Sequence, residues 1–121
     1  MAGNVSALAK GVYKYLPREH ALSRAADGDQ RAALASAAFG QDWVNEGAAV
    51  IVVAAAYGRT TRKYGQRGIR YVHMEAGHAA QNIHLQAVAL NLGAVVVGAF
   101  DDDKVKKMAL LKNEWVKRHG G

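Results

Sequence analysis

The stretch from Gly68 to Leu92, GIRYVHMEAGHAAQNIHLQAVALNL, decides the fold that we expect of this chain. It has no proline and one internal glycine, Gly77, and its apolar residues recur at the i, i+4, i+7 spacing of a helix. These apolar residues form two stripes: Val72, Ala76, Ala79, Ala80, Ile83, Ala87 and Leu90 in one, and Tyr71, Met74, Leu85, Val88 and Leu92 in the other. A helix that is apolar on two sides is expected to be buried on two sides, in the centre of a domain or between subunits.

Short elements precede this helix. Residues 12–16 and 20–22 predict two strands around a turn. The sequence Asp27-Gly28-Asp29 predicts the start of a helix over residues 30–39, because an aspartate side chain accepts the free N–H groups of a first helical turn. Gly40 is expected to end that helix in the left-handed conformation that glycine tolerates.

The remaining segments predict further strands and helices. Two apolar runs, residues 49–56 and 94–97, predict buried strands, and residues 57–66 predict a loop or a short exposed helix. Acidic residues 101–103 favour a helix start, and residues 104–111 continue an amphipathic helix. The order is therefore two strands followed by helix, strand, helix, strand and helix. We see no linker or repeat, so one α+β domain over residues 1–121 is expected.

Composition limits the class of protein. The 121 residues are half hydrophobic with a single proline, as is typical of a soluble globular domain. Because cysteine is absent, disulfides, thiolate metal ligands and a cysteine nucleophile are excluded. Charged residues interrupt the first 22 positions, and the longest apolar run, 48–57, is about half the length of a membrane helix. A cytoplasmic location without membrane contact is expected.

The net charge of +6 favours anionic ligands such as phosphates, nucleotides or nucleic acid. The basic residues cluster in 59–70 and 104–118, and neither stretch has the pattern of a nucleic-acid module. We therefore expect no nucleic-acid partner. A small basic nucleic-acid-binding protein, with an affinity that falls steeply with salt, is the alternative from a different class.

His73, Glu75 and His78 invite a metal interpretation. The two histidines lie about 140° apart on an ideal helix, so they are poorly placed to share one ion. No metal is expected here. We predict instead that His78, Gln81 and Asn82 form a buried polar network across a helix interface.

Several motifs, taken in order, resemble the SagB/ThcOx-type dehydrogenases of the nitroreductase superfamily. The sequences that carry the resemblance are RKYGQRGIRY at 62–71, EAGHAAQN at 75–82, LG at 92–93 and GAFDD at 98–102. It extends back to VYKY at 12–15, HAL at 20–22, GQ at 40–41 and WV at 43–44, and so covers about residues 11–111.

The resemblance implies a nitroreductase-like α+β fold, with a mixed sheet and a long central helix at a homodimer interface. It implies FMN as cofactor, two-electron hydride transfer through flavin N5, NADH or NADPH as electron donor, and a small-molecule or peptide substrate. The turn Val97-Gly98-Ala99 matches the family's position beside the flavin ring, where free backbone N–H groups reach N5 or O4. A plain strand-to-helix turn is the alternative interpretation.

Lys63-Tyr64 matches a Lys-Tyr pair implicated in the chemistry of family members that oxidise azoline rings in modified peptides. A phenol and an ammonium are suitable proton partners when a substrate loses a proton as hydride leaves to flavin. The resemblance thus makes Lys63 and Tyr64 the candidate catalytic residues. A solvated basic loop is the alternative.

The ends of the chain depart from the family pattern. Nothing before Gly11 resembles the arginine- and serine-rich segment that contacts the FMN phosphate and ribityl chain, and after Leu111 only Lys117 or Arg118 stands where a basic residue is expected. We therefore expect a domain shortened at both ends. Either a partner chain or the basic cluster near Arg62 and Arg67 completes the flavin site, or the chain is a noncatalytic dimerisation remnant that no longer holds FMN.

Overall fold

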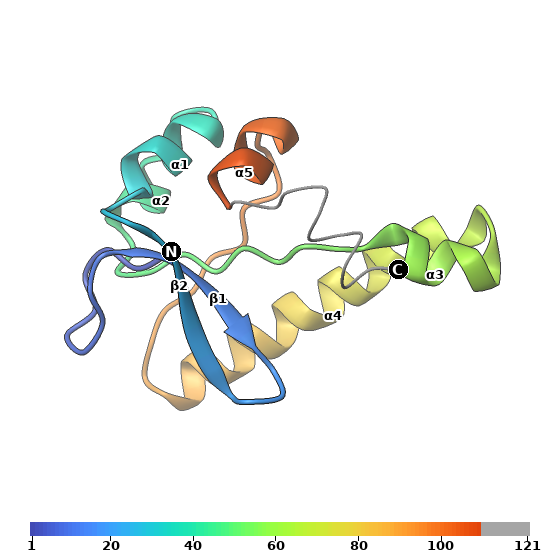
Figure 1. Ribbon diagram of the computed structural model, residues 1–121, viewed down its shortest axis with the longest axis horizontal. Coiled ribbons are helices and arrows are strands. Elements are labelled where there is room, and N and C mark those ends of the chain that lie inside the picture. The colour runs from blue at the N-terminus through green and yellow to red at the C-terminus, as the bar shows by residue number, and fades with distance from the viewer. Residues whose placement is uncertain (110–121) are drawn as a thin grey trace. The chain divides into compact units, whose positions relative to one another are not determined.

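The computed structural model describes residues 1–109, which divide into two compact units. The first unit comprises Met1–Val52 and residues 99–109, and the second comprises Val53–Gly98. The first unit holds strands β1 (Gly11–Leu16) and β2 (Ala21–Asp27) and helices α1 (Arg31–Ala37), α2 (Asp42–Glu46) and α5 (Asp102–Met108). Helices α3 (Tyr57–Tyr64) and α4 (Arg67–Ala89) form the second (Figure 1). No helix in residues 1–109 combines the length and the apolar character needed to cross a membrane.

The predicted hairpin is confirmed as strands β1, Gly11–Leu16, and β2, Ala21–Asp27. The strands pair antiparallel (Figure 1). Their register shifts between Val12 and Tyr13. The second strand runs past its predicted end because pairing with β1 holds residues 23–27, whose mixed polarity gives no strand pattern of its own.

Helix α1, Arg31–Ala37, ends close to the predicted residue. Phe39 and Gly40 take positive φ angles of 56° and 74°, and the Gly40 N–H donates to the Ala35 carbonyl at 2.9 Å.

Two further helices complete the first unit. Helix α2, Asp42–Glu46, was not predicted. The helix predicted after the acidic residues 101–103 is confirmed as α5, Asp102–Met108, and its predicted residues 110–111 lie outside the described residues. The structure adds a side-chain cap that was not predicted, because the Lys104 N–H donates to Asp101 Oδ1 at 3.0 Å. The buried apolar side chains of this unit are those of Ala2, Val12, Leu34, Ala35, Ala37, Ala38, Val44 and Val105.

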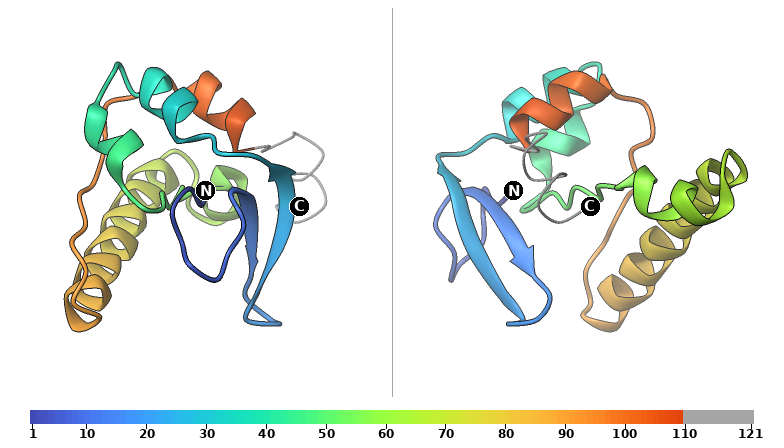
Figure 2. Two further views of the ribbon diagram at one scale, coloured as in Figure 1. Left: turned by 90° about the vertical axis from the view of Figure 1, so that its left-hand side faces the viewer. Right: turned by 45° about the vertical axis from the view of Figure 1, so that its right-hand side comes forward.

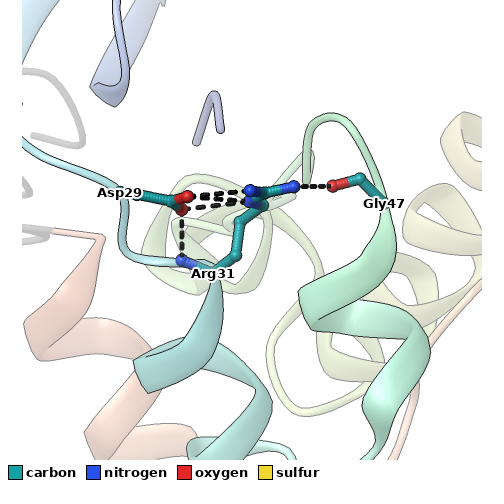
Figure 3. A network of polar contacts seen from close by, with 3 residues as sticks. All are labelled: Asp29, Arg31 and Gly47. Atoms are coloured by element: carbon teal, nitrogen blue, oxygen red, sulfur yellow. Dashed lines mark hydrogen bonds and ion pairs between the residues drawn. The ribbon is translucent and has the colours of Figure 1, made fainter. Parts of the chain in front are cut away.

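A charged clamp fixes the start of α1 (Figure 3). The Arg31 side chain donates to Asp29 from Nε at 3.0 Å and from Nη2 at 2.8 Å, and from Nη1 to the Gly47 carbonyl at 2.9 Å. The Arg31 backbone N–H also donates to Asp29 Oδ1 at 3.1 Å. The Asp29 and Arg31 side chains are 28% and 17% exposed, so the pair is partly sheltered from solvent screening. These hydrogen bonds lower the pKa of Asp29 to about 2.

The clamp predicts acid-dependent stability. The folded-state pKa of Asp29 lies below its ordinary value of 3.8, so the pair stabilises the fold above that pH, and the contribution disappears as the pH falls through about 2. We expect Asp29→Asn to lower the midpoint of thermal unfolding by several degrees at neutral pH. The difference in midpoint between the variant and the unmodified protein should disappear between about pH 4 and pH 2.

Asp27→Asn is the matched control for this experiment. Asp27 pairs with Arg24 at 3.2 Å, but its side chain is 84% exposed, so this substitution should change the midpoint little. Circular dichroism melts of the three proteins across this pH range make the comparison. An unchanged midpoint in Asp29→Asn would show that the clamp does not stabilise the unit.

The second unit is a helical hairpin (Figure 2, right). Helix α3, Tyr57–Tyr64, turns at Gly65, which has a φ of 60°, into α4, Arg67–Ala89. The short exposed helix that was one of the two predictions for residues 57–66 is thus the form observed.

The long helix predicted over residues 68–92 is confirmed as α4. It ends before the predicted Leu92, because Asn91 takes the left-handed conformation with a φ of 58°. The Leu92 N–H then closes the end by donating to the Ala87 carbonyl at 2.8 Å. The left-handed Asn91 therefore ends the helix.

The prediction of two buried strands over residues 49–56 and 94–97 is wrong. Ala49 forms one isolated bridge, and the other residues of both segments have no regular structure. Ile51 is 67% exposed and Val96 is 58% exposed. A strand needs a neighbour to pair its backbone groups, and no strand of residues 1–109 lies beside either segment. The predicted mixed sheet is replaced by the two-stranded hairpin.

Helix α4 is not covered on both sides within this chain. Its buried residues are Gly68 and Val72, whereas Met74, Leu85 and Val88 of the second stripe are 52%, 61% and 74% exposed. The predicted network of His78, Gln81 and Asn82 is not buried within the single chain, where all three residues are exposed, and its burial between subunits stays a prediction. Within the second stripe Tyr71 packs against Tyr64, whereas Met74, Leu85 and Val88 are left largely exposed.

Candidate functional site

The segment predicted to face a cofactor lies where the second unit ends. Val97 is half-buried, and Gly98 and Ala99 are exposed. Their backbone N–H groups donate to no acceptor within residues 1–109. A Cβ placed on Gly98 would meet no atom within 4 Å. This segment thus offers unpaired donors beside open space, which is the arrangement that a planar acceptor ring requires.

The first unit holds the residues that follow this segment. The Gln41 side chain donates from Nε2 to the Ala99 carbonyl at 2.8 Å and to the Ala38 carbonyl at 2.7 Å. The Asp101 N–H donates to the Ala37 carbonyl at 2.8 Å. Ala99 is therefore tied to the end of α1 through its carbonyl, while its N–H stays free to donate.

Lys63 and Tyr64, the candidate catalytic pair, occupy the last turn of α3. The Lys63 Nζ lies 5.2 Å from the centroid of the Tyr64 ring, and Tyr64 meets Tyr71 of α4 edge to face at a centroid distance of 5.2 Å. Tyr64 is 49% exposed. The ammonium and the phenol are thus neighbours on an accessible surface of the hairpin, held by α4.

Within residues 53–98, the candidate catalytic pair and the predicted flavin contacts are not linked to each other. In the described part of the second unit, no hydrogen bond or ring contact links Lys63 or Tyr64 to Val97 or Gly98. Lys117 and Arg118, the candidates for a phosphate contact, lie outside the described residues.

Sequence reasoning missed two polar pairs in the α3–α4 hairpin. Arg67 donates from Nε to the Tyr71 hydroxyl at 3.0 Å, a contact that the i, i+4 spacing could have suggested. His73 Nε2 lies 3.1 Å from the Tyr57 hydroxyl, with the two rings edge to face at 5.9 Å. The second pair joins α3 to α4 across 16 residues, and no local pattern indicates it.

The second unit carries strongly unbalanced charge. Residues 53–98 contain five lysine or arginine residues and one acidic residue, Glu75. No ion pair joins Glu75 to a basic side chain within residues 53–98. The five basic residues all lie on α3 or in the first turns of α4, which makes this surface attractive to anions.

Comparison with known proteins identifies the class. The model of the nitroreductase family matches residues 4–117. A protein of Methanocaldococcus jannaschii named "Putative nitroreductase" is 46% identical over 109 residues, which are 90% of this chain and 55% of that protein. No solved structure gives a significant match. The chain belongs to the nitroreductase family of oxidoreductases, whose members generally use FMN.

This chain spans about half the length of the curated relative that it matches. The α+β content, the long helix α4 and the short helix after Asp101 agree with the family assignment.

Proposed function

We propose that this chain forms part of an FMN-dependent oxidoreductase of the SagB/ThcOx type, acting on a small-molecule or peptide substrate with NADH or NADPH as electron donor. FMN, when bound, supplies two-electron hydride chemistry through its N5 atom. The observation that carries the proposal is the set of unpaired backbone N–H groups at Val97, Gly98 and Ala99. These donors fit the ring acceptors of a flavin, and the small side chains of Gly98 and Ala99 allow a ring to approach the backbone.

Lys63 and Tyr64 are the proposed proton-transferring residues. Their geometry supports this role, because the ammonium lies against the phenol ring and the phenol is half exposed to a substrate. We place the reaction in the cytoplasm, in keeping with a chain that has no cysteine.

A homodimer, or a partner chain that completes the flavin site, is part of the proposal. The exposed stripe of Met74, Leu85 and Val88 on α4 supports it, because an uncovered apolar helix face is typical of a protein interface. The alternative function is a noncatalytic dimerisation remnant, which the same exposed stripe favours and in which FMN is not held.

Flavin retention by a glycine variant tests the proposal. The absorbance spectrum is measured after incubation with excess FMN and desalting, and bands at about 370 and about 450 nm report bound flavin. We expect Gly98→Val to lower the retained FMN by about tenfold or more, because its side chain would stand where the ring must approach. The fold should be unaffected, since the new Cβ meets no atom within 4 Å.

Gly93→Val is the matched control, because a Cβ at Gly93 also meets no atom within 4 Å but lies outside the proposed contacts. Equal retention by the two variants would remove Gly98 from the site. Unmodified protein that releases all its FMN would contradict the enzyme proposal, and the mass of two chains by light scattering would then support the dimerisation remnant.

A further inference from the structure

A second candidate site lies on the opening turns of α4. An open hollow of about 500 Å³ is lined by Gln66, Arg67, Ile69, Arg70 and His73. This volume falls in the range of roughly 300–1,000 Å³ found for small-molecule sites. The proposed flavin-ring contacts at 97–99 and the proposed proton-transferring residues Lys63 and Tyr64 do not line the hollow, whereas Arg67, which the sequence offered as a candidate to complete the flavin site, does.

The side chains around the hollow have unused donors. Arg70 makes no hydrogen bond or ion pair with any residue in 1–109. Arg67 uses Nε for Tyr71, which leaves both terminal nitrogens of its guanidinium, and His73 uses Nε2 for Tyr57, which leaves Nδ1. Two forked guanidinium groups beside an imidazole and an amide are suited to the oxygens of a phosphate.

The carboxylate of Glu75 is not placed to compete for these donors. Glu75 is the acidic residue among residues 53–98, and it lies about 140° around α4 from Arg70 and about 160° from His73, at about 100° per residue. Two backbone groups at the start of α4 are already paired, because the Gly68 and Ile69 N–H groups donate to the carbonyls of Gly65 and Gln66. The side chains of Arg67, Arg70 and His73 therefore supply the donors on which the inference rests.

We propose that this hollow binds the phosphate of an organic phosphate ester. The two arginines bind the phosphate, and the apolar side chain of Ile69, 37% exposed, lies against the organic part. A volume larger than a single ion needs favours an ester over inorganic phosphate. Binding here does not require flavin at Val97–Ala99, so it goes beyond the proposed oxidoreductase activity.

Adenosine 5′-monophosphate is the probe, with adenosine as its phosphate-free counterpart. Titrations of the full chain are followed by the NMR signals of the His73 imidazole and the Arg70 backbone amide. We expect saturable binding of the monophosphate. The affinity for adenosine should be lower than that for the monophosphate by about tenfold or more. Arg70→Gln should weaken monophosphate binding by about tenfold or more, because a charged hydrogen-bond donor is lost.

Arg59→Gln is the matched control, because it removes the same charge from α3 but Arg59 does not line the hollow. We expect it to change the affinity by less than about twofold, the effect of an exposed distant charge. Equal weakening by both substitutions, or equal binding of adenosine and its monophosphate, would overturn the proposal. Circular dichroism of the variants checks that both retain their helices.

Two further pairs of ligands identify the source of the phosphate. If Arg70→Gln weakens binding of FMN but not riboflavin, the hollow holds the flavin's own phosphate. If it weakens binding of NADPH but not NADH, the hollow holds the phosphate of the electron donor. If the protein takes up no flavin yet binds the monophosphate through Arg70, the oxidoreductase proposal fails and the phosphate site stands.

Discussion

Replacing Gly68 by alanine is expected to destabilise the α3–α4 hairpin by about 1–3 kcal/mol, the usual cost of forcing an extra methyl group into a packed contact. Gly68 is buried at the start of α4. A Cβ there would lie 3.0 Å from both the Cα and the backbone N of Thr61 in α3. These are backbone atoms of a helix, so relief requires α3 to move as a whole. Urea unfolding followed by circular dichroism at 222 nm measures the loss.

Gly77→Ala is the matched control within the same helix. A Cβ at Gly77 meets no atom within 4 Å, so the substitution should add helix propensity without a clash and stabilise by up to about 1 kcal/mol. The two variants make the same chemical change in one helix and should shift stability in opposite directions. Stabilisation by both would show that α3 and α4 are not held at the observed separation.

Local signals predicted much of the fold. Helix α4 followed from apolar spacing along its own length, and α5 from the acidic residues 101–103, which favour the start of a helix. The β1–β2 hairpin followed from two short strand patterns around a turn. In each case the residues that stabilise the element lie close together in the sequence, so the pattern alone contains the information.

The two wrong strands show where such reasoning fails. Residues 49–56 and 94–97 are rich in alanine and valine, and apolarity alone does not supply the neighbouring strand that each needs. Helix α2, Asp42–Glu46, was missed for the related reason that five residues give too short a pattern. Strand pairing between distant segments depends on the folded chain, and a short apolar run does not indicate which segment will pair with it.

The candidate site was predictable only in part. The adjacency of Lys63 and Tyr64 is fixed by the chain itself, whereas the edge-to-face contact between Tyr64 and Tyr71 depends on how α3 packs on α4. The hollow beside Arg70 and His73 is likewise a product of that packing. Sequence reasoning identified the basic cluster but not which of its members have free donors.

Replacing Tyr64 by phenylalanine is expected to slow turnover by about 100-fold or more, within the range that general acid–base catalysis contributes. With NADH as donor and a nitroaromatic compound as acceptor, the acceptor's oxygen gains a proton as the nitro group is reduced. In this reductive direction Tyr64 is proposed to donate the proton, the reverse of the transfer expected when a substrate is oxidised by flavin. The substitution keeps the ring that contacts Tyr71 and Lys63, so the packing of the hairpin should persist. This expectation rests on the proposed flavin chemistry.

Stopped-flow measurements separate the role of Tyr64 from a structural one. Oxidation of NADH by the flavin-loaded protein should stay within about threefold, because that half-reaction needs no proton from Tyr64, whereas reduction of the nitro compound should carry the full loss. Tyr71→Phe is the matched control, because it removes a hydroxyl from the same aromatic pair, one that already accepts from Arg67 at 3.0 Å. If Tyr64→Phe slows both half-reactions equally, or no more than Tyr71→Phe does, the phenol positions the flavin or supports the hairpin and transfers no proton.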